Sequence, residues 1–150
     1  MRFYLVDQIL EIKPGAAIIG VKNVAMSEDV MEFHFPGNPV MPGVLLVEAL
    51  AQLAGCLEAS ESDFIRWFVP DTVRRAAFYG FARPGDQVRL EVTALPHPAD
   101  GRRAYSGVGT VGRRKVAAAE FEGPSLPLME LDDPEAQRRL FRRLTRAEEW

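Results

Sequence analysis

The feature that most restricts the fold of this chain is an apolar segment that follows Pro42. Residues 44–54 (VLLVEALAQLA) are apolar except for Glu48 and Gln52, and the segment has the length of a helix. A helix that is apolar nearly all round is buried on most of its sides. Pro42 can occupy the first turn, where a missing N–H costs little. We therefore expect one long core helix surrounded by other elements.

Several segments have the patterns of β-strands. The clearest alternates polar and apolar residues, the period of a half-buried antiparallel strand, and another is short, branched and apolar. The expected strands are residues 16–24, 89–93, 104–111 and 115–121. Turn residues separate the later strands, at Asp100-Gly101 and Gly112-Arg113. Together with the buried helix, these strands predict an α+β fold in which a curved antiparallel sheet wraps a long central helix.

The composition changes after Glu122. Residues 123–127 (GPSLP) are rich in glycine and proline, as linkers are. Asp133 and Pro134 have the cap and first-turn chemistry of a helix, which we expect to end near Trp150. The sequence therefore predicts a domain at residues 1–122. Residues 123–150 are expected to form a linker plus a C-terminal helical extension of the same domain.

Charge and cysteine content argue against several classes of protein. The chain has 18 basic and 21 acidic residues, a net charge of -3, whereas nucleic-acid binders normally carry a basic excess. The single cysteine, Cys56, excludes an internal disulfide and fits a reducing compartment. Glu48 and Gln52 interrupt the apolar run, which makes it a poor membrane helix. With no secretory leader visible, we expect a cytoplasmic protein with no membrane span and no nucleic-acid partner.

Residues 34–52 contain the groups best suited to chemistry. His34 begins a loop stiffened by proline and glycine, and histidine titrates near neutral pH, so its ring can take or give a proton. Gly43 and Val44 open the helix, where unpaired N–H groups and the positive end of the helix dipole can polarise a carbonyl oxygen. Each feature alone has an ordinary structural explanation, as a loop histidine or a helix start.

Glu48 is the second reactive group of this segment. A carboxylate on an otherwise apolar helix must be paired, neutral or part of a cavity wall, because burying it unpaired is expensive. Gln52 follows one helical turn later, so its amide can hydrogen-bond the carboxyl group. Alone, Glu48 is equally compatible with a buried structural role.

The order of these residues resembles the active-site segment of the bacterial 3-hydroxyacyl-acyl-carrier-protein dehydratases. In that family a histidine begins an HFPG-type loop, a Pro-Gly pair opens the central helix, and an acidic residue follows. Here His34-Phe35-Pro36-Gly37, Pro42-Gly43 and Glu48-Ala49-Leu50-Ala51-Gln52 match this order, and 48 − 34 = 14 positions separate His34 from Glu48, as in the family. The resemblance extends over roughly residues 3–121.

The resemblance implies a hotdog fold and a dimer whose active sites combine histidine and acid from different subunits. His34 would abstract the α-proton of a thioester, and Glu48 would protonate the departing hydroxyl or hold the water formed. Gly43 and Val44 would bind the thioester carbonyl, and Gln52 would orient Glu48. The implied partners are an acyl thioester, acyl carrier protein and further copies of the chain, in a dimer or a trimer of dimers. No metal or organic cofactor is needed.

The match to the family weakens between residues 64 and 84. Where family members usually carry a basic strand, this chain has the apolar Phe78-Tyr79-Gly80-Phe81. The difference suggests a paralogue with its own acyl preference or docking mode. Arg74, Arg75 and Arg83 are the candidates for docking an acidic carrier protein.

Alternative functions stay open on the sequence. The chain could be a dehydratase that also isomerises the double bond, although such relatives typically have aspartate in place of Glu48. It could instead be a non-catalytic hotdog partner that binds acyl chains or carrier protein. A hotdog thioesterase fits the histidine loop and Pro-Gly helix start less well. Acyl chain length and the pathway served are not determined by the sequence, and neither Cys56 nor His97 is assigned a role in the chemistry.

Overall fold

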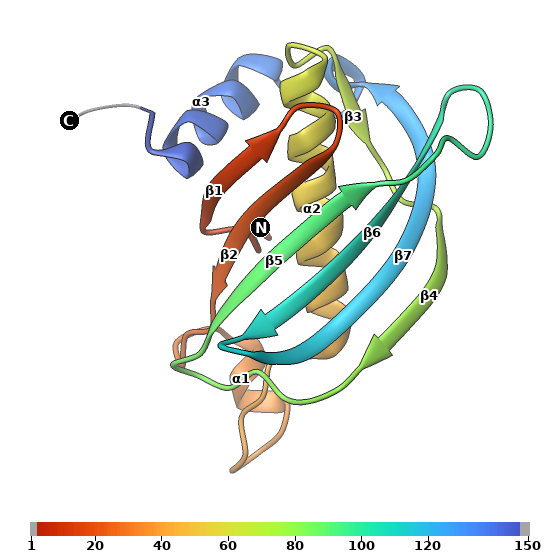
Figure 1. Cartoon of the computed structure of the whole chain (residues 1–150). Coiled ribbons are helices and arrows are strands. Elements are labelled where there is room, and N and C mark those ends of the chain that lie inside the picture. Colours follow the sequence, from red (N-terminus) through yellow and green to blue (C-terminus); the bar gives the residue numbers. More distant parts are fainter. Residues whose placement is uncertain (1–2, 148–150) are drawn as a thin grey trace.

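The computed structural model describes residues 3–147. Within these residues, a seven-stranded antiparallel sheet curls around one long helix (Figure 1). The elements are β1 (Gln8–Lys13), β2 (Ala17–Asn23), α1 (Val30–Phe33), α2 (Gly43–Glu61), β3 (Arg66–Phe68), β4 (Thr72–Phe78), β5 (Gln87–Ala94), β6 (Arg102–Val111), β7 (Arg114–Pro127), the 3-10 turn η1 (Leu128–Glu130) and α3 (Pro134–Thr145). The α+β arrangement expected from the sequence is confirmed.

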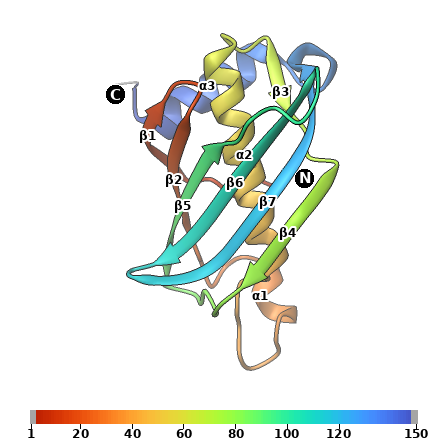
Figure 2. The same cartoon turned by 45° about the vertical axis from the view of Figure 1, so that its right-hand side comes forward.

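The sheet follows the order β1-β2-β5-β6-β7, and β7 carries two short strands on its outer edge. β4 pairs with residues 117–122 of β7, and β3 pairs with residues 125–127. Figure 2 shows β4 at the rim of the sheet, beside β7. In the part of the chain that the structure describes, no strand pairs with the other edge of β4.

Helix α2 fills the concave side of the sheet and supplies much of the core. Leu50, Leu53 and Leu57 are each at most 1% exposed. Gly107 of β6 lies directly under Leu50, and an added Cβ there would stand 3.0 Å from Leu50 Cδ1. Glycine at this position therefore lets the helix approach the sheet closely. α2 is the one helix of residues 3–147 that is long and apolar enough to cross a membrane, and its burial under the sheet marks it as a core helix.

The expected strands are confirmed with small shifts of their ends. β5 alternates buried and exposed residues as its sequence predicts, with Val88, Leu90 and Val92 turned into the core. The two expected turns lie between β5 and β6 and between β6 and β7, and Gly101 and Gly112 have positive φ angles there. β1, β3 and β4 lie outside the four expected segments, and β3 has only three residues.

The prediction of a linker at residues 123–127 is wrong, because β7 continues through this segment to Pro127. Pro124 pairs with β6 and Pro127 pairs with β3, so the strand has neighbours on both edges. Ser125 lies 6% exposed and donates its hydroxyl hydrogen to Oε1 of Glu58. A strand that hydrogen-bonds one oxygen of a buried carboxyl group is held in place despite its glycine and prolines.

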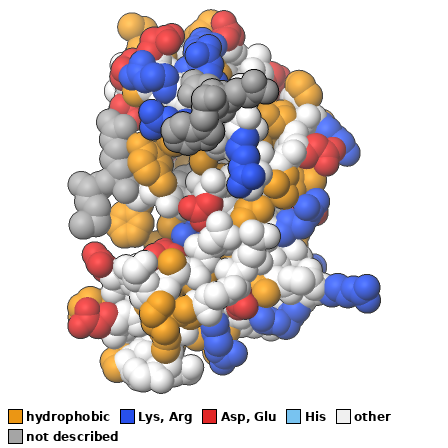
Figure 3. Space-filling model, turned by 90° about the vertical axis from the view of Figure 1, so that its left-hand side faces the viewer, with side chains coloured by type: hydrophobic (Ala, Val, Ile, Leu, Met, Phe, Trp, Pro, Cys, Tyr) orange, Lys and Arg blue, Asp and Glu red, His pale blue; other side chains and the backbone are white. Residues whose placement is uncertain are grey.

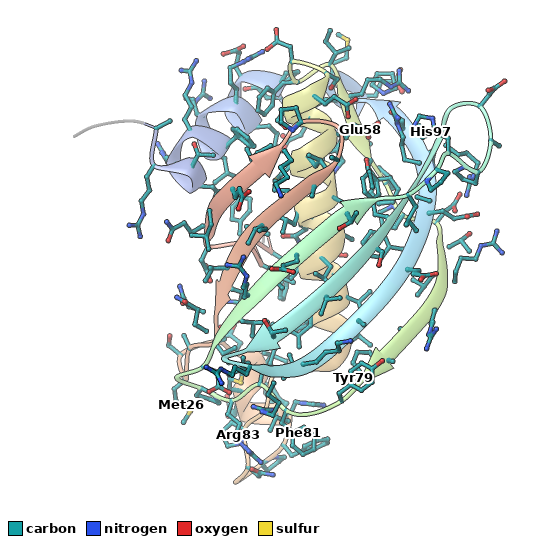
Figure 4. The ribbon with its side chains drawn as sticks, viewed as in Figure 1. Met26, Glu58, Tyr79, Phe81, Arg83 and His97 are labelled. Atoms are coloured by element: carbon teal, nitrogen blue, oxygen red, sulfur yellow. The ribbon has the colours of Figure 1, made fainter. Side chains whose placement is uncertain are left out.

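Glu58 is the centre of this buried polar cluster (Figure 4). It lies on α2 and is 1% exposed. Arg103 Nε donates to Oε1 of Glu58 over 3.3 Å, and Arg66 Nε donates to Ser125 Oγ over 2.6 Å. The cluster thereby ties α2 to β3, β6 and β7 at the end of the molecule away from α1. His97 lies beside Arg103 at its edge.

Helix α3 begins as its sequence predicts. Asp133 caps it by accepting a hydrogen bond from Glu135 N over 3.0 Å, and Pro134 is in the first turn. The helix ends at Thr145, earlier than expected, and the expected end at Trp150 lies outside the described residues. α3 packs along β1, and charged side chains gather over it at the top of Figure 3.

We expect Ser125→Ala to lower the free energy of unfolding by about 1–3 kcal/mol, because the buried carboxyl group of Glu58 loses a hydrogen-bonding partner. Urea denaturation monitored by circular dichroism measures the change. Ser106→Ala on β6 is the matched control, since the Ser106 hydroxyl makes no side-chain hydrogen bond within residues 3–147. Equal losses for the two variants would show that the Glu58 cluster does not hold the strand.

Candidate active site

His34 ends helix α1 and has a fixed ring orientation. Its Nδ1–H donates to the carbonyl oxygen of Val40 over 2.9 Å, and Val40 N–H donates back to the His34 carbonyl over 2.8 Å. The ring of Phe35 stacks against the imidazole with 4.1 Å between the ring centroids. Because Nδ1 is the donor to Val40, the neutral ring presents the lone pair of Nε2. That nitrogen is the one available to accept a proton.

Gly43 is the first residue of α2, and Pro42 caps the helix from just outside its first turn. The N–H groups of Gly43 and Val44 have no acceptor inside the helix, as in any first turn. The ring of Phe78 lies against Gly43, so close that an added Cβ would stand 2.5 Å from Phe78 Cδ1. A larger residue at this position would require the Phe78 ring to move.

One stripe of α2 is turned away from the sheet. Val44, Glu48 and Gln52 follow one another at intervals of four residues, so they lie on the same face of the helix. Val44 is 68% exposed, Glu48 is exposed and Gln52 is half-buried, whereas most of the remaining helix is buried. The candidate residues of α2 thus occupy the side that the sheet leaves uncovered.

A groove of about 420 Å³ runs between this stripe and β4. We call it the α2–β4 groove. Its walls are largely apolar and come from Val44, Val47, Glu48, Ala51, Val73 and Phe78 among others. Glu48 therefore lies in the wall of a cavity, which is one of the three situations expected for it. Within a single chain its side chain is exposed rather than buried.

Gln52 holds the Glu48 carboxylate. Its Nε2 donates to Glu48 Oε1 over 2.9 Å, which confirms the expected hydrogen bond. Gln52 also accepts from Leu5 N–H over 2.9 Å and donates to the Phe3 carbonyl over 2.9 Å. Since Leu5 supplies a donor, the amide oxygen of Gln52 must face Leu5, and its NH₂ group must face Glu48. The N-terminal segment thereby holds the Gln52 amide in the orientation that turns its NH₂ group toward the Glu48 carboxylate.

His34 and Glu48 are held by different neighbours within one chain. The imidazole bonds Val40, and the carboxylate bonds Gln52. Within the described chain, the imidazole and the carboxyl group are therefore each oriented by another residue and are not hydrogen-bonded to each other.

The three arginines expected to dock a partner lie in two places. Arg74 and Arg75 are on β4, where Arg74 Nη2 forms an ion pair with Glu122 over 2.7 Å. Arg83 lies beyond the end of β4, near α1, with its guanidinium 5.4 Å from the centroid of the Phe81 ring (Figure 4). They do not form one cluster within the chain.

The sequence did not reveal the role of Phe78 or of the N-terminal segment. Nothing in the pattern around residue 78 indicates that its ring will lie over a glycine 35 positions earlier, as the distance to Gly43 shows. Phe3 and Leu5 act through backbone atoms, which leave no trace in side-chain identity. Among residues 3–147, no group of three or more histidine, cysteine or acidic side chains could hold a metal ion.

The chain resembles known proteins over most of its length. Residues 1–120 match the family model described as a FabA-like domain. The chain is 40% identical over 122 residues to the 3-hydroxyacyl-[acyl-carrier-protein] dehydratase FabZ of Caldanaerobacter subterraneus, covering 79% of this chain and 84% of that protein. It is also 40% identical over 124 residues to the FabZ of Caulobacter vibrioides, covering 79% and 76%.

Solved structures share the fold at low sequence identity. A Streptococcus mutans protein bound to acetyl-CoA superposes with a TM-score of 0.66 and 13% identity, over 85% of this chain and 94% of that one. The fluoroacetyl-CoA thioesterase FlK superposes with a TM-score of 0.64 and 12% identity, over 87% and 98%. These likenesses support the hotdog fold and carry no information on substrate.

We expect Gln52→Ala to speed amide hydrogen exchange at Leu5 by roughly fivefold, because the N–H loses its acceptor and one hydrogen bond is worth about 1 kcal/mol. Exchange measured by NMR reports this without any activity assay. Asp7 N–H, which bonds Val21 over 2.7 Å, is the internal control and should not change. Unaltered exchange at Leu5 would mean that Gln52 does not fix the N-terminal segment.

Proposed function

This chain belongs to the FabA-like family, and from that membership we propose that it uses His34 and Glu48 to remove water from a (3R)-hydroxyacyl group on acyl carrier protein, yielding the trans-2-enoyl thioester. It is a hydro-lyase of fatty-acid synthesis. The observation that carries the residue assignment is the stripe of α2, where Glu48, held by Gln52, lies one turn beyond the free N–H groups of the helix start.

The first half of the reaction is removal of the α-proton. Nε2 of His34 accepts it, since Nδ1–H is engaged with Val40. The electron pair of the broken C–H bond moves onto the thioester carbonyl oxygen. The N–H groups of Gly43 and Val44 stabilise the negative charge there, and oxyanion donors of this kind contribute on the order of 3 kcal/mol to such a step.

The second half is loss of the hydroxyl group. Glu48, in its protonated form, gives its proton to the β-hydroxyl as the C–O bond breaks, and the electron pair of the enolate forms the Cα–Cβ double bond. Water leaves, with His34 protonated and Glu48 ionised. Transfer of one proton from His34 to Glu48 restores both groups. Gln52 keeps the carboxyl group turned toward the groove throughout.

A second copy of the chain would complete the site. β4 has an unpaired edge in the described chain, and Val73, Arg74, Arg75 and Ala76 are exposed along it. An open strand edge beside an apolar groove is a surface that pairing with an identical strand can cover. Such a pair would bury the α2–β4 groove and shelter Glu48. We propose that His34 of one copy then serves with Glu48 of the other.

We expect the hydration of a crotonyl thioester, followed by loss of ultraviolet absorbance, to fall by a factor on the order of 10²–10⁴ in His34→Ala and in Glu48→Gln, because each removes one partner of the acid–base pair. Circular dichroism checks that the variants fold. An inactive wild type that still binds acylated carrier protein would favour the non-catalytic partner, and retained activity in both variants would exclude the assignment.

Co-expression of the two variants tests whether the pair is shared between subunits. A mixed dimer would have one site with both wild-type residues, so random mixing should restore roughly a quarter of wild-type activity, since half the dimers are mixed and one of two sites is intact. If His34 and Glu48 of the same chain act together, no site is intact in any dimer. Activity no higher than that of the single variants would therefore reject the shared site.

The β4 edge itself can be tested by charge. We expect Ala76→Glu to dissociate the dimer, because pairing of the exposed edge would then take a carboxylate out of water. Sedimentation velocity measures the mass. Ala99→Glu, in the exposed β5–β6 connection, is the matched control and should leave the dimer intact. A dimer that survives Ala76→Glu would place the contact elsewhere.

For docking of an acidic carrier, Arg83 is better placed than Arg74 or Arg75. The segment that carries it joins the His34 loop, since Met41 N–H donates to the Ala82 carbonyl over 2.8 Å. Arg83 lies at this end with the exposed Met26, Tyr79 and Phe81 (Figure 4). Arg74 and Arg75 are on the edge proposed to pair with a second copy. Docking at Arg83 would deliver a carrier-bound acyl group beside the imidazole.

We propose the cytoplasm as the compartment of the enzyme, because a chain with one cysteine has no internal disulfide and fits a reducing compartment. Cys56 is buried, and burial raises the pKa of its thiol to about 12, so the cysteine is a packing residue and not a reactive one.

A further inference from the structure

A second cavity, of about 280 Å³, has Gln52 in its wall. We call it the α3 cavity. It lies between α2, the N-terminal segment and the C-terminal part of the chain, and its wall includes Val6, Cys56, Trp67, Leu128, Leu140 and Leu144. Its volume is close to the lower end of the range of about 300–1,000 Å³ seen for ligand pockets.

Part of the wall of the α3 cavity lies outside the match to the family model. The match to the family model ends at residue 120, whereas Leu128, Leu140 and Leu144 come from η1 and α3. α3 is anchored to the rest of the domain by Phe141, whose ring meets Phe64 edge-on with 5.3 Å between the centroids. The helix therefore contributes wall residues that the matched part of the chain does not supply.

The polar side chains of the cavity are already satisfied by protein partners. Gln137 Nε2 donates to Asp132 Oδ2 over 2.7 Å, and Gln52 bonds Glu48, Phe3 and Leu5. What the wall offers to a ligand is thus mainly aliphatic and aromatic surface. A ligand that buries only methylene groups suits such a wall, because a polar ligand would lose its hydrogen bonds to water without replacement.

Gln52 connects this cavity to the chemistry. It lines the α3 cavity and hydrogen-bonds Glu48, so the cavity begins one helical turn beyond the proposed acid. Cys56 lies two turns beyond Glu48, about 12 Å along the helix axis. An acyl chain with its β-carbon at Glu48 needs on the order of ten carbons to span that distance, and a four-carbon chain stops short of it.

We propose that the α3 cavity receives the distal end of the acyl chain, so that the C-terminal helix selects substrates of medium or greater length. This inference rests on the proposed dehydration at His34 and Glu48. The helix acts as the far wall of the acyl site, and the residues of that wall, Leu140 and Leu144, lie outside the match to the family model.

The test compares chain lengths in variants that narrow or widen the cavity. Leu140→Trp should lower kcat/KM for dodecenoyl thioesters at least tenfold and change that for crotonyl thioester less than twofold; Leu140→Ala should not discriminate against long chains. Arg143→Trp, on the exposed side of α3, is the matched control and should leave the profile unchanged. Equal effects of Leu140→Trp on short and long chains would overturn the inference.

A binding measurement separates this inference from the proposed function. Trp67 lines the cavity, and Trp150→Phe leaves it as the single tryptophan. A saturated ω-bromododecanoyl pantetheine thioester should quench Trp67 fluorescence in this variant. Quenching in a protein that hydrates no thioester would retain the acyl site and reject the dehydratase. Turnover without quenching, and without a chain-length effect, would retain the dehydratase and reject the acyl site.

Discussion

The packing of α2 against the curved sheet is the constraint on which the rest of the structure depends. Leu50, Leu53 and Leu57 must be buried, and this fixes the rotation of the helix about its own axis. The rotation in turn decides which residues remain uncovered. Val44, Glu48 and Gln52 are on the uncovered stripe because they lie opposite the leucines, so the hydrophobic core determines where the carboxyl group points.

The central helix and the strand β5 could be predicted because each has a local pattern of apolar and polar residues. The apolar run at residues 44–54 could only be a buried helix, and the alternation in β5 could only be a half-buried strand. Ser125 shows where local patterns fail. Its neighbours are glycine and prolines, and a buried bond to Glu58, 67 positions away, keeps them in the sheet. β3 was missed because three residues are too few to show a period.

The candidate site was predictable in its residue identities and less so in its surroundings. The spacing of Glu48 and Gln52 predicts their hydrogen bond, and the structure contains it. The exposure of Glu48 could not be derived, because the pattern of a helix does not show which of its sides other elements leave uncovered. The backbone contacts of Phe3 and Leu5 with Gln52 could not be derived either, since any residue can offer a carbonyl or an amide hydrogen.

Both ends of the described chain contact Gln52 or the α3 cavity. This restricts where the protein can be labelled or immobilised. The N-terminal segment orients Gln52, and the C-terminal helix forms a wall of the α3 cavity. The connection between β5 and β6, by contrast, is exposed from residue 96 to residue 101 and lies at the far end of the molecule from α1 (Figure 1). A dye, tether or inserted reporter is best accommodated in that loop.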